Sequence, residues 1–311
     1  MKHALLVSEF LSTPWALMPE RLQLFSGVIS RWAQGVTASD EVMAGIAADR
    51  EARSARAQNN VRAGGGAIAV LPLYGIVTQR GNMADNISGP GSVSTQAFAT
   101  ALRDVLTDET VGSILIDIDS PGGSVYGVGE LADLIYQARG QKPVVALANS
   151  LAASAAYWIG CAASEFYVTP SGEVGSIGVR QAHVDQSQAL AAEGIKPTLI
   201  SAGKFKVEGN PYQPLDDEAR AFMQLRVDEY YAAFIKGIAR SRGVPLAQVR
   251  DGMGQGRVLG AEAALAENMV DGIMTFDQLI KKMQKEARVA PSPRGAPGSR
   301  LAAARLSLMG T

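Results

Sequence analysis

The stretch SILIDIDSPGGSVYGVGELADLIYQARGQKPVVALAN, residues 113–149, decides the fold class. Residues 113–119 form an apolar run of strand length, residues 125–139 carry apolar side chains at helical spacing, and residues 143–149 form a second apolar run. Two buried strands joined through a helix predict a parallel pair with a right-handed crossover. The stretch therefore indicates an α/β protein.

The same alternation continues on both sides of this stretch. Upstream, residues 67–77 predict a strand that bends at Pro72, and residues 94–108 predict a helix with Ser94 as its N-terminal cap. Downstream, the sequence predicts helices over 151–163, 184–193 and 216–242, and strands over 197–201 and 269–274. Repeated strand–helix units are typical of a parallel sheet covered by crossover helices. The long helix 216–242 is expected either to face the core or to form an interface between subunits.

Composition along the chain divides it into three parts. Residues 1–62 form a mixed, partly helical leader whose end is charged, then polar, and is followed by three glycines at 64–66. Residues 63–288 hold the periodic segments and form the folded domain. Residues 289–311 are rich in Pro, Gly, Ser and Arg without an apolar period, which predicts a flexible tail.

Composition also restricts the chemistry. Of the 311 residues, 47% are hydrophobic, which is enough for a sizeable core, and the net charge of −1 argues against a nucleic-acid-binding protein. The single cysteine, Cys161, excludes an internal disulfide and a cysteine-rich zinc site, and is expected to pack in the core. The two histidines, His3 and His183, leave little for a histidine metal site or a Ser-His-Asp triad. We therefore expect no metal, no cofactor, and a catalytic base other than histidine.

Two apolar segments resemble export or membrane signals. The N-terminal run is interrupted by Glu9, too early for the core of a signal peptide. Residues 143–164 carry no charge and are long enough for a membrane span, but they begin with Pro143 and contain Asn149 and Ser150. A buried strand followed by a helix of small residues explains them better. We expect a cytoplasmic protein without a membrane anchor.

The first candidate for chemistry is the turn Asp119-Ser120-Pro121-Gly122-Gly123-Ser124, which lies between a predicted strand and a predicted helix. Because glycine has no β-carbon, another backbone can approach closely. Amide N–H groups at such a turn can face an anion or a developing oxyanion. The spacing Gly123-x3-Gly127-x-Gly129 differs from the dinucleotide fingerprint GxGxxG. A tight turn without any ligand is the alternative.

The second candidate is Ser154, in the sequence Ala152-Ala153-Ser154-Ala155-Ala156. A serine among alanines in an apolar helix is usually a packing residue. Here it falls in the first turn after a predicted strand, a junction that places nucleophiles beside helix amides, and its small neighbours leave room for a substrate. The surrounding sequence lacks the GxSxG pattern of α/β-hydrolases.

Lys204 and Lys206 supply the third candidate, a base. An exposed side chain is the ordinary state of lysine. A catalytic lysine needs its pKa, about 10.4 in water, to be brought near 7 by burial or a positive neighbour. A lysine shifted in this way can deprotonate a serine when histidine is missing. Alternation along an extended strand would place both lysines on one face, so spacing leaves the choice between them open.

Four motifs occur in order along the chain. They are strand-Asp119-Ser120-Pro121-Gly122-Gly123, then Ala152-Ala153-Ser154 before Tyr157-Trp158-Ile159, then Val174-Gly175-Ser176-Ile177-Gly178-Val179, and finally Gly203-x-x-Lys206-x4-Pro211. Together they resemble the signal peptide peptidase A family, over about residues 66–275. The resemblance implies the Clp protease/crotonase fold for residues 63–288 and a Ser-Lys peptidase, in a family that includes bacteriophage prohead proteases.

The resemblance also implies a role for individual residues. Ser154 matches the family's nucleophile, Lys206 its general base, and Ser176 the serine whose hydroxyl orients the lysine amine. The backbone amide of Gly123 matches the oxyanion hole, with a second amide expected at Ala155. Many family members have Gly-Gly after the nucleophile, where this chain has Ala155-Ala156. Alanine keeps the amide donor, so this departure concerns the fit of the substrate rather than the chemistry.

The lack of a visible membrane anchor favours the phage branch, whose protease would cleave capsid or scaffold proteins during head maturation, in the host cytoplasm or the prohead. The resemblance also implies a homo-oligomeric ring. A substrate peptide is expected to bind as an added strand, and the arginine-rich regions 51–62 and 288–305 are expected to be self-cleaved. Three alternatives stay open: a cytosolic bacterial signal-peptide-peptidase-like protease, a crotonase-like acyl-CoA enzyme, and a non-catalytic capsid-assembly protein.

Overall fold

The structure is a computed structural model that describes residues 12–18, 61–63, 66–80 and 92–289, together with single residues scattered between 20 and 48. Most of the predicted leader and the tail from residue 290 onward lie outside the described residues. The expected self-cleavage regions fall there as well, apart from a few residues at their edges.

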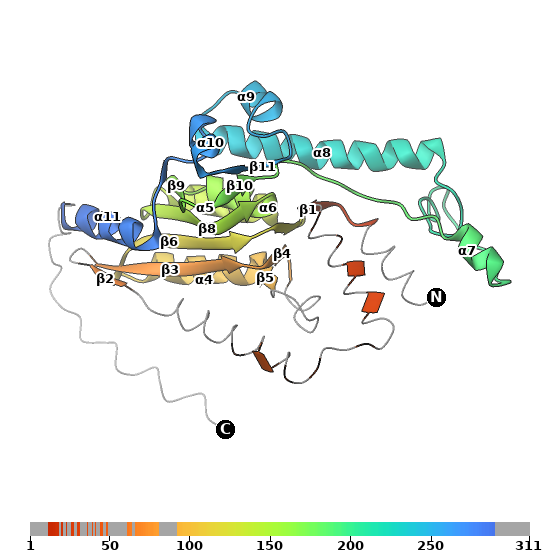
Figure 1. The fold of residues 1–311 in the computed structure, drawn as a ribbon, viewed down its shortest axis with the longest axis horizontal. Coiled ribbons are helices and arrows are strands. Elements are labelled where there is room, and N and C mark those ends of the chain that lie inside the picture. Colours follow the sequence, from red (N-terminus) through yellow and green to blue (C-terminus); the bar gives the residue numbers. More distant parts are fainter. Residues whose placement is uncertain are drawn as a thin grey trace.

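A largely parallel sheet forms the centre of the protein (Figure 1). Its strands run in the order β11-β10-β8-β6-β3-β2, and β9 pairs with both β8 and β12. Their bounds are β2 Val61–Ala63, β3 Gly66–Tyr74, β6 Val111–Ser120, β8 Val144–Ala153, β9 Glu165–Val168, β10 Glu173–Gly175, β11 Val258–Gly260 and β12 Gly272–Ile273. The central pairs β3–β6, β6–β8 and β8–β10 are all parallel. The predicted α/β class with parallel strands and crossover helices is therefore confirmed.

A second, four-stranded sheet continues from the ends of the central strands, in the order β1-β7-β4-β5. Its strands are β1 Trp15–Leu17, β4 Ile76–Thr78, β5 Ser92–Ser94 and β7 Gly122–Ser124. β3 passes into β4 across Gly75, and β6 passes into β7 across Pro121. The small sheet therefore carries the glycine turn that the sequence singles out.

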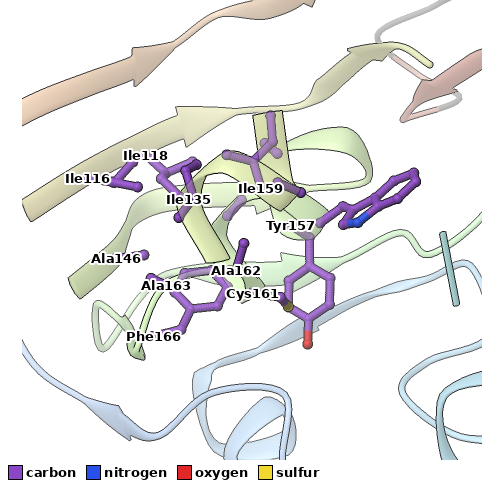
Figure 2. Close-up of a cluster of buried hydrophobic side chains, with 14 of the residues drawn as sticks. Ile116, Ile118, Ile135, Ala146, Tyr157, Ile159, Cys161, Ala162, Ala163 and Phe166 are labelled. Carbon is purple, nitrogen blue, oxygen red and sulfur yellow. The ribbon is translucent and has the colours of Figure 1, made fainter. Parts of the chain in front are cut away.

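Alternation along β6 separates two hydrophobic layers. Ile114, Ile116 and Ile118 belong to the larger core with helices α4 Thr95–Thr107, α5 Val128–Ala138 and α6 Ala155–Cys161, whereas Leu115 belongs to a smaller cluster with α11 Phe276–Val289. Figure 2 shows part of the larger core, where Tyr157, Ile159 and Cys161 come from α6. Cys161 is a fully buried free cysteine, as expected, and burial raises the pKa of its thiol to about 12.

Sequence patterns placed several helix and strand ends correctly and others not. Ser94 caps α4 by accepting a hydrogen bond from the amide of Ala97, as predicted. The helix predicted over 151–163 begins only at Ala155, because residues 151–153 extend β8 and pair with β10. The uncharged run 143–164 is thus strand plus short helix, and no helix within the described residues has the length and apolarity to cross a membrane.

Residues 197–201, predicted as a strand, form no regular structure. They are exposed, Ile200 almost completely, and no strand of either sheet pairs with them. An apolar run needs a partner strand to become extended sheet, and this segment lies where none is available. The prediction was wrong for that reason.

The long predicted helix is α8, Asp217–Arg242, capped by Asp216 and ended by Gly243. Its C-terminal half faces the core, where the ring of Phe234 stacks on Trp158 of α6 at 4.9 Å between centroids. Its N-terminal half projects away, with the side chains of Phe222 and Leu225 about half exposed. Figure 1 shows α7, Ser187–Ala192, beyond this projecting end. We call residues 187–225 the arm. The short helices α9 Leu246–Asp251 and α10 Ala261–Ala266 complete the fold.

Candidate active site

The glycine turn after β6 is packed tightly against neighbouring backbone. The hydroxyl of Ser120 donates to the carbonyl of Gly75 at 2.6 Å and accepts from the amide of Gly122 at 3.2 Å, which fixes the start of the turn. Gly122 has φ +96°, a conformation that favours glycine. A β-carbon at Gly122 would collide with the Ala16 carbonyl oxygen and the Cβ of Ser154. The turn therefore lies directly beside Ser154.

Ser154 occupies a strained position between β8 and α6. Its φ is +56°, unusual for a residue with a β-carbon, and it is buried. Its amide donates to the carbonyl of Gly175 at 2.6 Å, and its hydroxyl lies 3.5 Å from the carbonyl oxygen of Gly178. Its side chain does not cap α6. Strain of this kind persists only where the surrounding structure imposes it, and it is concentrated at functional sites.

Ser176 directly follows β10, as Ser154 directly follows β8. These two parallel strands pair Ala153 with Gly175 at their ends, and the amide of Ser154 donates to the carbonyl of Gly175, so both serines lie at the same edge of the sheet. Ser176 is also buried, with φ +54°, and its amide donates to the carbonyl of Arg257 at 2.7 Å. The structure therefore brings two buried serines with positive φ to the carboxyl ends of adjacent strands.

Four of the five predicted site residues thus lie together: Gly123, Ser154, Ala155 and Ser176. The fifth, Lys206, lies on the arm, in the exposed segment between α7 and α8. Among the described residues, no hydrogen bond joins its amine to Ser154. The structure does not assemble the predicted dyad within one chain.

Contacts along α8 show how far the lysine segment lies from the serines. The amine of Lys204 pairs with Glu218, in the first turn of α8, at 2.8 Å. Phe234, which stacks on Trp158 of α6, comes 16 residues after Glu218. At 1.5 Å per residue, these two points of the helix are roughly 24 Å apart. In Figure 1, α7 lies away from β8, beyond the projecting end of α8.

The two lysines differ in their surroundings. Lys204 forms the ion pair with Glu218 and its amine also lies 4.4 Å from the ring centre of Phe205. Lys206 has no carboxylate partner among the described residues. Both sit in a series of turns rather than on one face of a strand, so the expected alternation between them was wrong. The ion pair therefore distinguishes Lys204 from Lys206.

His183 is the histidine that lies within the described residues. The Nε2 atom of His183 lies 2.8 Å from the carbonyl oxygen of Asn210, on the arm. Within the described part of the chain, no three His, Cys, Asp or Glu side chains are grouped so that they could hold a metal ion. The candidate site thus consists of hydroxyl groups and backbone amides.

Sequence patterns missed a polar cluster close to the site. The hydroxyl of Tyr74, at the end of β3, donates to the carboxylate of Asp117 on β6, and the side-chain amide of Asn149 on β8 donates to the same carboxylate at 3.1 Å. Burial raises the pKa of Asp117, against the effect of these two hydrogen bonds. The cluster ties together the three strands that lead into the turn and into Ser154. The apolar pattern of β6 hid this polar position, and only a spatial neighbour could have indicated it.

A second element that the sequence did not indicate is β1. Its three residues pair antiparallel with β7, so that Ala16 lies opposite Gly123. The leader therefore contributes a strand directly at the glycine turn.

Replacing Gly123 by alanine should damage the site. A β-carbon there would collide with the carbonyl of Val77 in β4, which pairs with β7. We expect the strand to shift and the melting temperature to fall by several degrees, which corresponds to about 1–3 kcal/mol of overpacking. Thermal unfolding measures the effect. Gly178→Ala is the control, because nothing lies within 4 Å of an added β-carbon there. Equal stability of the two variants would contradict the packing described for the turn.

Comparison with known proteins agrees with this architecture. The model of peptidase family S49 matches residues 137–290. The head-tail preconnector protein GP5 of Enterobacteria phage P21 is 34% identical over 263 residues, which cover 82% of this chain and 49% of that protein. The capsid assembly protease C of Escherichia phage lambda is 34% identical over 235 residues, 76% of this chain and 51% of that protein. Protease 4 of Salmonella typhi is 30% identical over 226 residues, 72% of this chain and 35% of that protein.

The chain spans about half the length of these two phage proteins. Both the matched family and the phage relatives agree with the resemblance that the four sequence motifs indicate. The parallel sheet with crossover helices is consistent with the Clp protease-like fold expected for it. From the family match and the motifs together, the chain resembles peptidase family S49 over residues 137–290.

Proposed function

We propose that the protein is a serine endopeptidase in which Ser154 is the nucleophile and Lys206 the general base. The observation that carries the proposal is the strained, buried Ser154 placed between the Gly123 turn and Ser176. The match to peptidase family S49 and the protease named among the relatives support peptide hydrolysis as the reaction. The alternative of an acyl-CoA enzyme would need neither a strained serine nor a lysine.

In the proposed reaction, the neutral amine of Lys206 takes the proton of the Ser154 hydroxyl as Oγ attacks the carbonyl carbon of the scissile peptide. The amides of Gly123 and Ala155 hold the negative charge that develops on the carbonyl oxygen. Lys206 then gives its proton to the leaving amine, and water hydrolyses the ester on Ser154. Ser176 would hold the lysine amine in place by accepting a hydrogen bond from it.

For this reaction the amine of Lys206 must become buried, away from solvent. A lysine acts as a base only when its amine is neutral, and burial favours the neutral form. The arm is exposed in one chain, with Ile200, Phe205, Phe222 and Leu225 presenting apolar side chains to solvent. We infer that the arm docks on a neighbouring copy in a homo-oligomeric ring, which would cover these side chains and bring Lys206 to the partner's serine.

The relatives suggest the class of substrate. One is described as a capsid assembly protease and another as a head-tail preconnector protein. We propose that this chain likewise cleaves capsid or scaffold proteins during phage head maturation, in the host cytoplasm or the prohead. The function is tested by incubating such a capsid or scaffold protein separately with this chain and with the Ser154→Ala variant of this chain. Cleavage by the unaltered chain alone supports the proposed function. Cleavage by neither refutes it for that substrate.

A further inference from the structure

Residues 15–17 of the leader form the strand β1, which lies between two segments that border Ser154. On one side, β1 pairs antiparallel with β7, and the amide of Met18 donates to the carbonyl of Pro121 at 3.2 Å. On the other side, Trp15 and Arg180 exchange two backbone hydrogen bonds of 2.8 and 2.9 Å. The side-chain amide of Gln181 also donates to the carbonyl of Ser12 at 2.6 Å. Backbone groups on both sides, in β7 with Pro121 and in Arg180, therefore form hydrogen bonds with the leader strand.

The pairing register places one carbonyl of the leader at the candidate oxyanion hole. In an antiparallel ladder, opposed residues alternate between pairs that exchange hydrogen bonds and pairs that do not. The amide of Met18 donates to Pro121, so Met18 and Pro121 form a hydrogen-bonded pair. Ala16 and Gly123 lie two residues farther along the same ladder, and they therefore form a hydrogen-bonded pair as well. The amide of Gly123 thus points at the carbonyl of Ala16. This carbonyl oxygen lies beside Ser154, because a β-carbon added at Gly122 would collide with both the Ala16 oxygen and the Cβ of Ser154.

The side chains of this strand are buried as well. Trp15, Ala16 and Leu17 are each less than a tenth exposed, and Ala16 belongs to the larger hydrophobic core. A strand held only by its edges would leave such side chains in water. Both the backbone and the side chains of these three residues are therefore enclosed by the rest of the chain.

We propose that residues 13–18 occupy the peptide-binding groove of this site as a built-in substrate analogue, presenting the Ala16 carbonyl to Ser154. This inference rests on the proposed peptidase function. It follows that any other peptide must displace the segment before it can reach Ser154. A single chain would then be inactive for two reasons: the leader segment fills the groove, and Lys206 lies on the arm, away from Ser154.

A purely structural strand is the competing explanation, and the two predict opposite effects. Removing a structural strand lowers stability and activity together. Removing a bound substrate analogue opens the groove and raises activity on an added peptide. The variant Ala16→Pro removes the amide that bonds to Gly123 while leaving the rest of the groove unchanged. Ala16→Ser is the matched control, because serine is small and keeps the amide.

The experiment uses the full chain and a fluorescent synthetic peptide with the sequence of residues 12–18, STPWALM. A tethered segment competes at an effective concentration in the millimolar range. We expect Ala16→Pro to bind the peptide at least about tenfold more tightly than the wild type or Ala16→Ser, and to raise kcat/KM for an added substrate by a similar factor. Equal binding of the peptide to all three proteins would overturn the proposal, as would unchanged or lower hydrolysis by a folded Ala16→Pro variant that is itself active.

Binding and hydrolysis separate this proposal from the proposed function. If the peptide binds tightly to Ala16→Pro but none of the proteins hydrolyses any peptide, the groove assignment holds and the peptidase function fails. If Ala16→Pro does not fold, Leu17→Glu replaces it, because a charge on that buried side chain disfavours the docked strand and changes no residue of the two segments that border it. The same two measurements then decide.

Discussion

Replacing Ser154 by alanine is expected to lower kcat/KM for peptide hydrolysis by at least about 10³-fold while the protein remains folded. The hydroxyl oxygen is the atom that forms the acyl-enzyme in the proposed reaction. Alanine keeps the β-carbon and the amide that bonds to Gly175, so the strained backbone has the same support. Steady-state hydrolysis of a fluorogenic peptide, with circular dichroism as the check on folding, measures both parts.

A matched control exists on the same strand. Ser150 lies on β8 with an exposed side chain, and Ser150→Ala should retain activity within about twofold, as is usual for surface substitutions. A folded Ser154→Ala variant that keeps more than a few per cent of the wild-type rate would contradict the assignment of the nucleophile.

Lys206→Ala should be nearly as inactive as Ser154→Ala, because without a base the serine hydroxyl stays protonated near neutral pH. The expected loss in kcat is about 10³-fold or more, with little change in stability since the side chain is exposed on the arm. Lys204→Ala is the paired comparison. Its surface ion pair with Glu218 contributes little to stability, so this variant should keep most of the activity. If Lys204→Ala is the inactive variant and Lys206→Ala is active, the base has been misassigned.

Local patterns predicted the parts of the fold that local physics determines. The apolar run in β6 and the Ser94 cap both follow from side-chain chemistry within a few residues, and both are present. The extension of β8 to Ala153 was missed because it depends on pairing with β10, about 20 residues away along the chain. Sequence spacing also could not show that residues 197–201 have no partner strand, and so it predicted sheet where the chain is exposed.

In the candidate site too, some residues could be identified from the local sequence, whereas the position of others depends on the tertiary structure. Ser154 stands out in the sequence because it follows a buried strand, and its strained backbone agrees with that interpretation. Gly123 stands out as part of a turn. The position of Lys206 on the arm could not be derived, because it depends on how α8 projects from the core. The pairing of β1 with β7 joins segments about 100 residues apart, and the short leader strand has no pattern of its own that identifies a partner.

Mixing two inactive variants tests the central claim most directly. In the proposed site, Ser154 of one copy works with Lys206 of another. The Ser154→Ala and Lys206→Ala proteins are mixed in equal amounts, dissociated and reassembled together. The mixed assemblies should contain intact serine–lysine pairs and recover about a quarter of the wild-type rate. A mixture of Ser154→Ala with the double variant should remain inactive and serves as the control. If the first mixture is as inactive as its two components, although assembly is confirmed by mass measurement, the proposed site shared between copies is contradicted.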